Sequence, residues 1–308
     1  MDAWSTAMDV APGTDLTKDA RYLPVARANG VARLLGLGLN TISLVSPRRA
    51  AALVNDLVWC RPRRPPRKPD DAAALAQAER IDVVAGEQVL RAYAWGRGPT
   101  VVLVHGWGGS ASQMSRMAVQ LAARGLRVVA YDAPAHGDSS VKLTDFPTMT
   151  SALQRVVERV GGVQAVVAHS AGCVALLRAM RSGLRLQRVV LVSAFAQLAL
   201  PLASLGFALG LSPRLQAHHI ASLRQRFGSD FLETYSPEEL VRDLATGGLI
   251  VHDNGDREFG VANALRIASQ WPGAELFLTD GLGHYRILKD ESVARRIGDS
   301  LAGLPAHP

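Results

Sequence analysis

The sequence predicts an α/β fold, a mostly parallel sheet flanked by helices, on two observations. First, six short and almost wholly apolar runs lie at residues 101–104, 128–131, 165–168, 189–192, 249–251 and 276–278. Strands this apolar are buried on both faces, as they are in a parallel sheet covered by helices. Second, helix-compatible stretches at 112–124, 148–160, 172–181, 261–271 and 292–301 separate most of these runs. This alternation is the pattern of right-handed crossovers.

Two further runs, at residues 80–85 and 88–95, are joined through Gly86 and predict an antiparallel hairpin ahead of the parallel strands. In open α/β sheets, ligands bind beyond the carboxyl ends of the strands. Reactive residue types should therefore follow the strand runs directly. The residues that do so are His105, Asp132, Ser170, Asp256 and His284.

Composition limits the class of protein. A chain of 308 residues with 48% hydrophobic and 20% charged side chains can bury a large core, which excludes disorder as a description of the whole. Cys60 and Cys173 are too few for a disulfide framework and fit no zinc spacing. Residues 1–12 lack the basic start and apolar core of a secretory signal, and no apolar run reaches 18 residues. We expect a soluble, cytoplasmic protein.

The chain divides near residue 75, into an extension of residues 1–75 and a main domain of residues 76–308. The extension predicts helices at 26–44 and 47–59, with Pro47 at the first helical position after a Ser46 cap. A basic, proline-rich linker follows at 61–69. We expect the extension to pack against its own domain. Formation of a homodimer and contact with a membrane surface remain alternatives.

The net charge of +7 comes mainly from one stretch. Residues 48–68 contain seven Arg and Lys side chains against one acid, Asp56. A solvated linker explains this charge, and weak contact with an anionic surface is the alternative. Because the basic stretch has no interleaved aromatic residues and no nucleic-acid-binding fold signature, we expect no nucleic-acid partner. Because no apolar run reaches 18 residues, we expect no stable membrane insertion.

One connection interrupts the alternation of strand and helix. Residues 197–246 have no strand character and predict a small, largely helical lid. The apolar run at 198–209 either packs on the sheet domain or lines a pocket for an acyl or alkyl group. The sequence does not distinguish between these two roles.

Ser170 is the candidate nucleophile. It lies in Ala-His-Ser-Ala-Gly at residues 168–172, which matches the strand–turn–helix motif G-x-S-x-G except that Ala168 replaces the first glycine. The flanking residues must be small so that strand and helix can approach closely, and alanine adds only a methyl group. Cys173 follows on the new helix, where we expect it to be buried and inert.

Serine needs a base that is held by an acid. His284, in a glycine-bracketed loop, is the candidate base, and Asp256, in a turn-rich loop after a strand, is the candidate acid. Asp132 and Asp253 compete with Asp256, but Asp253 lies very close to the strand end and Asp132 follows an earlier strand. The order serine, acid, histidine belongs to one particular fold.

Backbone amides should bind the oxyanion, because they are fixed donors that need no reorganisation as charge develops. We expect one from Ala171, after the nucleophile, and one from near Trp107 in His-Gly-Trp-Gly-Gly at residues 105–109. His105 is expected to organise this loop and His136 to be a hydrogen-bonded loop residue. His169, between Ala168 and Ser170, either touches substrate or packs.

Four ordered motifs strongly resemble the α/β-hydrolase family over residues 80–301. They are HGWGG, the YDAPAHGDSS stretch at 131–140, AHSAG and the pair Asp256 and His284. The resemblance implies an eight-stranded, mostly parallel sheet, no cofactor, and an ester, thioester or related acyl substrate. The spacing of Asp256 after His252 matches the family, and in the D-x-P-x-H-G-x-S pattern the residue at Asp132 tends to be structural. Members that act on haloalkanes or epoxides place Asp at the elbow, which Ser170 argues against.

The sequence therefore predicts a serine hydrolase of small-molecule carboxylic esters that acts through Ser170, Asp256 and His284. A thioesterase or acyltransferase on the same residues is the nearest alternative, and a non-catalytic binding module is the alternative of another class. No metal is expected, since the adjacent residues His218 and His219 point about 100° apart on a helix and no carboxylate joins them.

Overall fold

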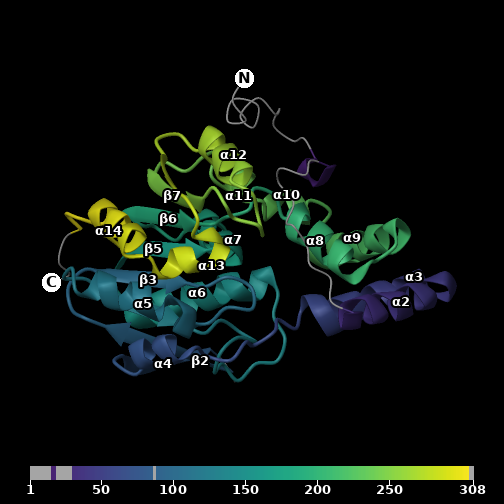
Figure 1. The fold of residues 1–308 in the computed structure, drawn as a ribbon, viewed down its shortest axis with the longest axis horizontal. Helices are drawn as coiled ribbons and strands as arrows, with labels where there is room; N and C mark the ends of the chain where they lie inside the picture. Colours follow the sequence, from purple (N-terminus) through teal and green to yellow (C-terminus); the bar gives the residue numbers. More distant parts are fainter. Residues whose placement is uncertain (1–14, 19–29, 86–87, 305–308) are drawn as a thin grey trace.

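The computed structural model describes residues 15–18, 30–85 and 88–304, and at its centre is an eight-stranded sheet (Figure 1). The strand order is β1-β2-β4-β3-β5-β6-β7-β8. β2 is antiparallel to both of its neighbours, and all the other pairs are parallel. The mostly parallel sheet predicted from the sequence is confirmed. The strands are β1 (Glu79–Ala85), β2 (Gln88–Trp95), β3 (Thr100–Val104), β4 (Arg127–Tyr131), β5 (Val163–His169), β6 (Arg188–Val192), β7 (Gly248–Asp253) and β8 (Glu275–Thr279).

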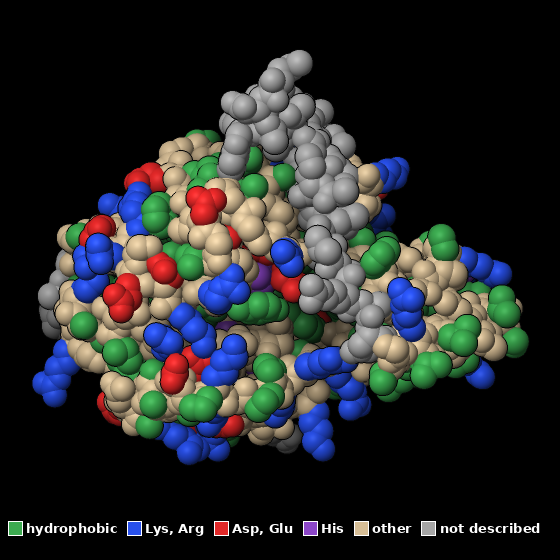
Figure 2. All heavy atoms as spheres, in the orientation of Figure 1, with side chains coloured by type: hydrophobic (Ala, Val, Ile, Leu, Met, Phe, Trp, Pro, Cys, Tyr) green, Lys and Arg blue, Asp and Glu red, His purple; other side chains and the backbone are tan. Residues whose placement is uncertain are grey.

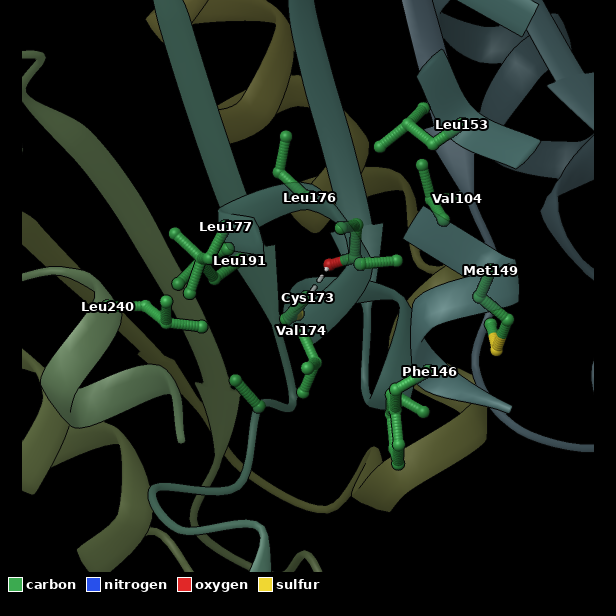
Figure 3. Close-up of a cluster of buried hydrophobic side chains, with 14 of the residues drawn as sticks. Val104, Phe146, Met149, Leu153, Cys173, Val174, Leu176, Leu177, Leu191 and Leu240 are labelled. Atoms are coloured by element: carbon green, nitrogen blue, oxygen red, sulfur yellow. Dashed lines mark hydrogen bonds between the residues drawn. The ribbon is translucent and has the colours of Figure 1, made fainter. Parts of the chain in front are cut away.

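Helices cover both faces of the sheet, which is why the central strands are apolar throughout. Along β3, Val101 and Leu103 belong to one buried cluster, whereas Val102 and Val104 belong to another. The first cluster includes α5 (Ala111–Ala122), α14 (Glu291–Ser300) and the end of α4 (Pro69–Leu75). The second includes α6 (Phe146–Val160), α7 (Ala171–Arg181) and α12 (Ala262–Gln270). Figure 3 shows part of the second cluster, in which Cys173 lies among apolar side chains.

Local signals explain where these helices begin. The Asp145 carboxylate accepts a hydrogen bond from the Thr148 amide and caps α6, and Pro147 occupies the first turn. The Asp290 carboxylate accepts the amides of Ser292 and Val293 and caps α14. α4 was not predicted from the sequence. Pro69 at its first position, followed by two acidic residues and three alanines, is the signal that indicates it.

The connection between β6 and β7 is helical, as predicted. It contains α8 (Ala199–Leu209), α9 (Pro213–Phe227), α10 (Phe231–Thr234) and α11 (Pro237–Leu240). Two short helices, α13 (Gly283–Arg286) and η3 (Ile287–Lys289), follow β8. The candidate base His284 lies in α13.

The extension forms η1 (Leu16–Lys18), α2 (Gly30–Val45), α3 (Pro47–Val54) and η2 (Asn55–Trp59). The predicted helix at 26–44 corresponds to α2, and residues 26–29 lie outside the described residues. Residues 1–12, which lack the features of a secretory signal in the sequence, also lie outside them. Of the predicted linker at 61–69, residues 61–68 contain no helix or strand, whereas Pro69 begins α4. The division into residues 1–75 and 76–308 stays a prediction.

α2 and α3 pack on the lid helices α8 and α9, and these four helices form a helical projection beside the sheet (Figure 1). Their small separate core comprises Leu39, Ala50, Ala51, Val54, Leu209, Leu211 and Leu215. Gly36 makes the closest approach, because a Cβ atom there would lie 1.6 Å from the carbonyl oxygen of Leu209. None of the described helices is long and apolar enough to cross a membrane.

Candidate active site

Ser170 lies at a sharp turn between β5 and α7. Its backbone has φ 51° and ψ −121°, a strained conformation for a residue with a side chain. The Ser170 amide donates to the Val192 carbonyl 2.9 Å away, which ties the turn to β6. Such strain persists only when the surroundings enforce it, and it clusters at functional sites.

Glycines beside this turn let three segments meet. A Cβ atom on Gly172 would lie 2.6 Å from the His105 carbonyl oxygen, and one on Gly106 would lie 2.9 Å from the Cβ of Ser170. The loop after β3 therefore reaches the Ser170 turn at van der Waals distance. Ala168, which replaces the first glycine of the motif, is fully buried within β5.

Asp256 and His284 come together from the loops after β7 and β8. The His284 Nδ1 is 2.8 Å from Asp256 Oδ2, and both side chains are almost fully buried. Asp256 Oδ1 accepts the amides of Glu258 and Phe259 at 2.8 and 3.1 Å. With Nδ1 as donor to Asp256, the His284 Nε2 is left as an acceptor. Ser170 and His284 line the same cavity.

The electrostatics favour an ionised Asp256. Burial raises its pKa, but the hydrogen bond with His284, the charges of the His284 and His252 rings and the amide of Phe259 together outweigh burial, so the pKa lies below its ordinary value. His252 Nε2 donates to the Phe259 carbonyl at 2.8 Å and lies 3.4 Å from Asp256 Oδ2. Burial lowers the pKa of His252, which favours the neutral form of this ring.

Asp132 and Asp253, the two alternatives to Asp256 as the acid, accept hydrogen bonds from backbone amides. Asp132 accepts the amides of Ala111 and Asp138, at 2.7 and 2.8 Å. Asp253 accepts the amide of Leu282 at 2.9 Å and the hydroxyl of Thr279 at 2.8 Å. These bonds arrange the loops around the cavity, and neither aspartate has a hydrogen bond with His284 among those of the described residues.

Two histidines organise the loop at 105–109. His105 Nδ1 donates to the Gly106 carbonyl, and its Nε2 accepts the Ala133 amide. His136 Nδ1 donates to the Pro134 carbonyl, and its Nε2 accepts the Gly108 amide. Burial lowers the pKa of His136 to about 3, which keeps the ring neutral and able to accept.

The two residues expected to supply the oxyanion donors are Trp107 and Ala171. Because the amide of Gly108 is occupied by His136, the preceding residue, Trp107, is the candidate of this loop. Ala171 is the first residue of α7, so its amide precedes the hydrogen bonds within the helix. Trp107 and Ala171 both line the cavity with Ser170.

The cavity has a volume of about 620 Å³. In Figure 2, histidine side chains are visible in a hollow on this face of the molecule. Lid residues Pro201, Ser204 and Leu205 line the cavity, whereas Leu200 and Leu202 are buried in the core on the α7 side of the sheet. The apolar run at 198–209 therefore packs partly in the core and partly along the cavity.

The extension supplies a wall that sequence analysis missed. Val58 and Trp59 line the cavity, and the Trp59 ring stacks on Trp107 with centroids 5.2 Å apart and an interplanar angle of 22°. Tyr285, beside His284, was also missed and lines the cavity. Nothing local in the sequence around Trp59 indicates which ring it meets.

Three further residues considered in the sequence, His169, His219 and Cys173, are hydrogen-bonded to other parts of the protein. His169 lines the cavity, and its Nε2 donates to the His284 carbonyl at 2.9 Å. His219 donates to Asn55 Oδ1 at 2.7 Å, and the described residues include no group of three or more side chains suited to hold a metal ion. Cys173 is buried, donates to the Ala168 carbonyl, and has a pKa raised by burial.

Residues 101–296 match the family model described as "Alpha/beta hydrolase family". The chain belongs to the alpha/beta hydrolase family. No curated protein matches it. Among solved structures, the alpha/beta hydrolase fold is shared with the Pyrococcus furiosus esterase Pf2001, which is 18% identical with a TM-score of 0.62 over 80% of this chain and 97% of that one.

Two other solved structures share the alpha/beta hydrolase fold. One is a membrane phospholipase A described as a bacterial virulence factor, with 17% identity and a TM-score of 0.58 over 89% of this chain and 97% of that one. The other is the thioesterase domain from the curacin biosynthetic pathway, with 19% identity and a TM-score of 0.54 over 73% and 99%. These similarities show the fold.

Proposed function

We propose that this alpha/beta hydrolase cleaves carboxylic esters through Ser170, His284 and Asp256. The observation that carries the proposal is the arrangement of these residues. A serine in a strained turn shares a cavity with a histidine whose Nδ1 is hydrogen-bonded to a buried carboxylate. The Asp256 bond fixes the tautomer in which His284 Nε2 can accept a proton.

In the proposed mechanism, His284 Nε2 accepts the Ser170 proton while Ser170 Oγ attacks the carbonyl carbon of the ester. Asp256 stabilises the imidazolium that forms, and the amides of Trp107 and Ala171 bind the oxyanion. The tetrahedral intermediate collapses to an acyl-enzyme as His284 protonates the leaving alcohol. Water then attacks the acyl group as His284 takes a proton from it, and the second tetrahedral intermediate collapses. His284 returns that proton to Ser170 Oγ, which releases the acid and restores the enzyme.

The cavity supports an ester with an apolar acyl or alkyl group. Its apolar walls include Trp59, Phe146 and Phe195. Its polar lining residues include Gln113 and Ser204 besides Ser170 and His284. Ligand sites typically combine apolar walls with a few placed polar groups. A thioester would suit the same cavity, so hydrolysis of matched esters and thioesters of graded chain length decides between these two substrate classes.

The test is the Ser170→Ala variant with a fluorophosphonate probe and a chromogenic ester. We expect the wild-type protein to be labelled and to turn over the ester, and the folded variant to do neither. A folded wild-type protein that stays unlabelled would favour a non-catalytic binding module. Full activity of Ser170→Ala would reject the assignment of the nucleophile. We further propose a cytoplasmic location, in solution or on the cytoplasmic face of a membrane, which protease protection in intact cells tests.

A further inference from the structure

The outer face of α2 carries large apolar side chains. Val31, Leu34, Leu37, Leu44 and Val45 are 75, 70, 64, 74 and 92% exposed. On the opposite face, which contacts the protein, Leu39 is the one large apolar side chain that is buried, beside a glycine at position 36 and a serine at position 43. The partly buried residues of that face are small or polar, as in Ala32 and Asn40. A helix of a water-exposed domain normally has the reverse arrangement, with its large apolar residues toward the core. This outward face therefore suits an apolar environment other than the protein's own core.

Exposed cations lie on α2, on the adjoining helix α3 and on the linker that follows. Residues 30–68 contain eight Arg and Lys against the single acid Asp56. Among the described residues, five of these cations are exposed and have neither an ion pair nor a side-chain hydrogen bond. They are Arg33, Arg48, Arg49, Arg63 and Lys68. Figure 2 shows hydrophobic and basic side chains together on the projection.

A groove leads from this face to the candidate active site. It has a volume of about 700 Å³ and is lined by Val31 and Leu35 of α2 and by Arg63 and Lys68 of the linker. It shares Trp107 with the cavity at Ser170, together with further lining residues. These shared residues are Val58, Gln113, Leu205 and Tyr285. The two spaces are therefore adjacent.

We propose that the helical projection docks on the surface of an anionic phospholipid membrane, with α2 lying in the interface. Apolar side chains enter the acyl boundary while these exposed cations meet anionic headgroups, the combination typical of interfacial helices. The 16 residues of α2 are too few to span a bilayer. A second copy of the chain fits this face less well, because it would oppose two strongly basic surfaces.

The groove then gives the substrate class. This step rests on the proposed function. The ester is then an amphipathic lipid, whose acyl chain passes from the membrane interface along the groove toward Ser170. Arg63 and Lys68 line the groove and would face an anionic headgroup on that path.

The test is cosedimentation of the full-length protein with phosphatidylcholine vesicles, with and without phosphatidylglycerol. We expect binding to the phosphatidylglycerol vesicles that weakens with added salt. Arg48→Gln/Arg49→Gln should bind about 25-fold more weakly, at roughly fivefold per cation removed. Leu34→Glu/Leu37→Glu should lose binding at least about tenfold. Matched controls, which should bind as wild type does, are Arg185→Gln/Arg295→Gln and Val84→Glu, all exposed residues outside the projection.

Absence of vesicle binding, equal binding to both vesicle types, or wild-type binding by both projection variants would overturn the proposal. So would a wild-type dimer in sedimentation velocity that dissociates in Leu34→Glu/Leu37→Glu, since a second copy would then cover this face. Fluorophosphonate labelling and hydrolysis of a short soluble ester are measured in parallel. They should be unchanged in the projection variants, so failure of docking and failure of the proposed chemistry are separate results.

Discussion

Replacing Asp256 by asparagine tests the proposed chemistry at a single atom. The oxygen of the new carboxamide can still accept the amides of Glu258 and Phe259, as Asp256 Oδ1 does. The carboxamide nitrogen then faces His284 Nδ1, which is 2.8 Å from Asp256 Oδ2 in the wild type. Two donors cannot pair, so His284 shifts its proton to Nε2 and can no longer accept the proton of Ser170.

The wrong tautomer should lower kcat by about 10⁴-fold, or about 5.5 kcal/mol of barrier. The assay is kcat on a soluble chromogenic ester, with the rate of fluorophosphonate labelling as a second readout. Urea unfolding should show a small change in stability, because the shape and the Oδ1 hydrogen bonds are retained.

Asp253→Asn is the matched control, since Asp253 is buried nearby and has no hydrogen bond with His284 among the described residues. Its Oδ2 accepts from both Leu282 and Thr279, so the amide should cost about 1–3 kcal/mol of unfolding free energy. The kcat of the folded Asp253→Asn fraction should stay within about tenfold of wild type. Asp256→Asn activity within about tenfold of wild type, or a folded Asp253→Asn variant that is as inactive as Asp256→Asn, would refute the reasoning.

Three further predictions concern stability and pocket shape. Trp59→Ala removes the ring stacked on Trp107, so it should lower the free energy of unfolding by about 3–5 kcal/mol and raise kcat/KM for bulky esters relative to short ones. Arg266→Met leaves the Glu238 carboxylate buried without the guanidinium 2.7 Å away, and should cost about 3–5 kcal/mol in urea unfolding. Burial lowers the pKa of His219 to about 4 from 6.5. Since the unfolded chain binds the proton first as pH falls below about 6.5, His219 lowers stability between pH 6.5 and 4, and His219→Gln should flatten that slope by about 1.4 kcal/mol per pH unit.

Each of these three has its control. Trp59→Phe keeps an aromatic ring on Trp107, and a loss as large as that of the alanine variant would show that the stack does not matter. Arg266→Met/Glu238→Leu should recover much of the lost stability, and no recovery would contradict the buried-charge explanation. For His219→Gln, whose amide can still donate to Asn55, a pH slope identical to that of wild type would mean that His219 is protonated equally in the folded and unfolded states.

The sheet could be predicted because its signal is local. Each strand from β3 to β7 contains an apolar run buried on both faces. Ser170 follows β5 directly, and Asp256 and His284 lie in the segments after β7 and β8. The connectivity of a parallel sheet then brings those ends to one edge, without any knowledge of side-chain packing.

The walls of the cavity could not be predicted, because they depend on contacts between distant segments. Trp59 meets Trp107 across 48 positions of sequence, and no periodicity in either segment specifies that partner. α2 is a related case. Its apolar residues at helical spacing predict a helix, but not that Leu34 and Leu37 face outward, because Gly36 and the close approach to Leu209 decide which side meets the protein.

The stack of Trp59 on Trp107 has a practical consequence for anyone who shortens this chain. The family match begins at residue 101, yet a fragment starting there would lack the indole that supports the loop beside the nucleophile. It would also lack Asp71, whose carboxylate is paired with Lys289 a few positions beyond His284. A fragment that keeps the cavity at Ser170 intact must therefore begin well before residue 101, upstream of Trp59.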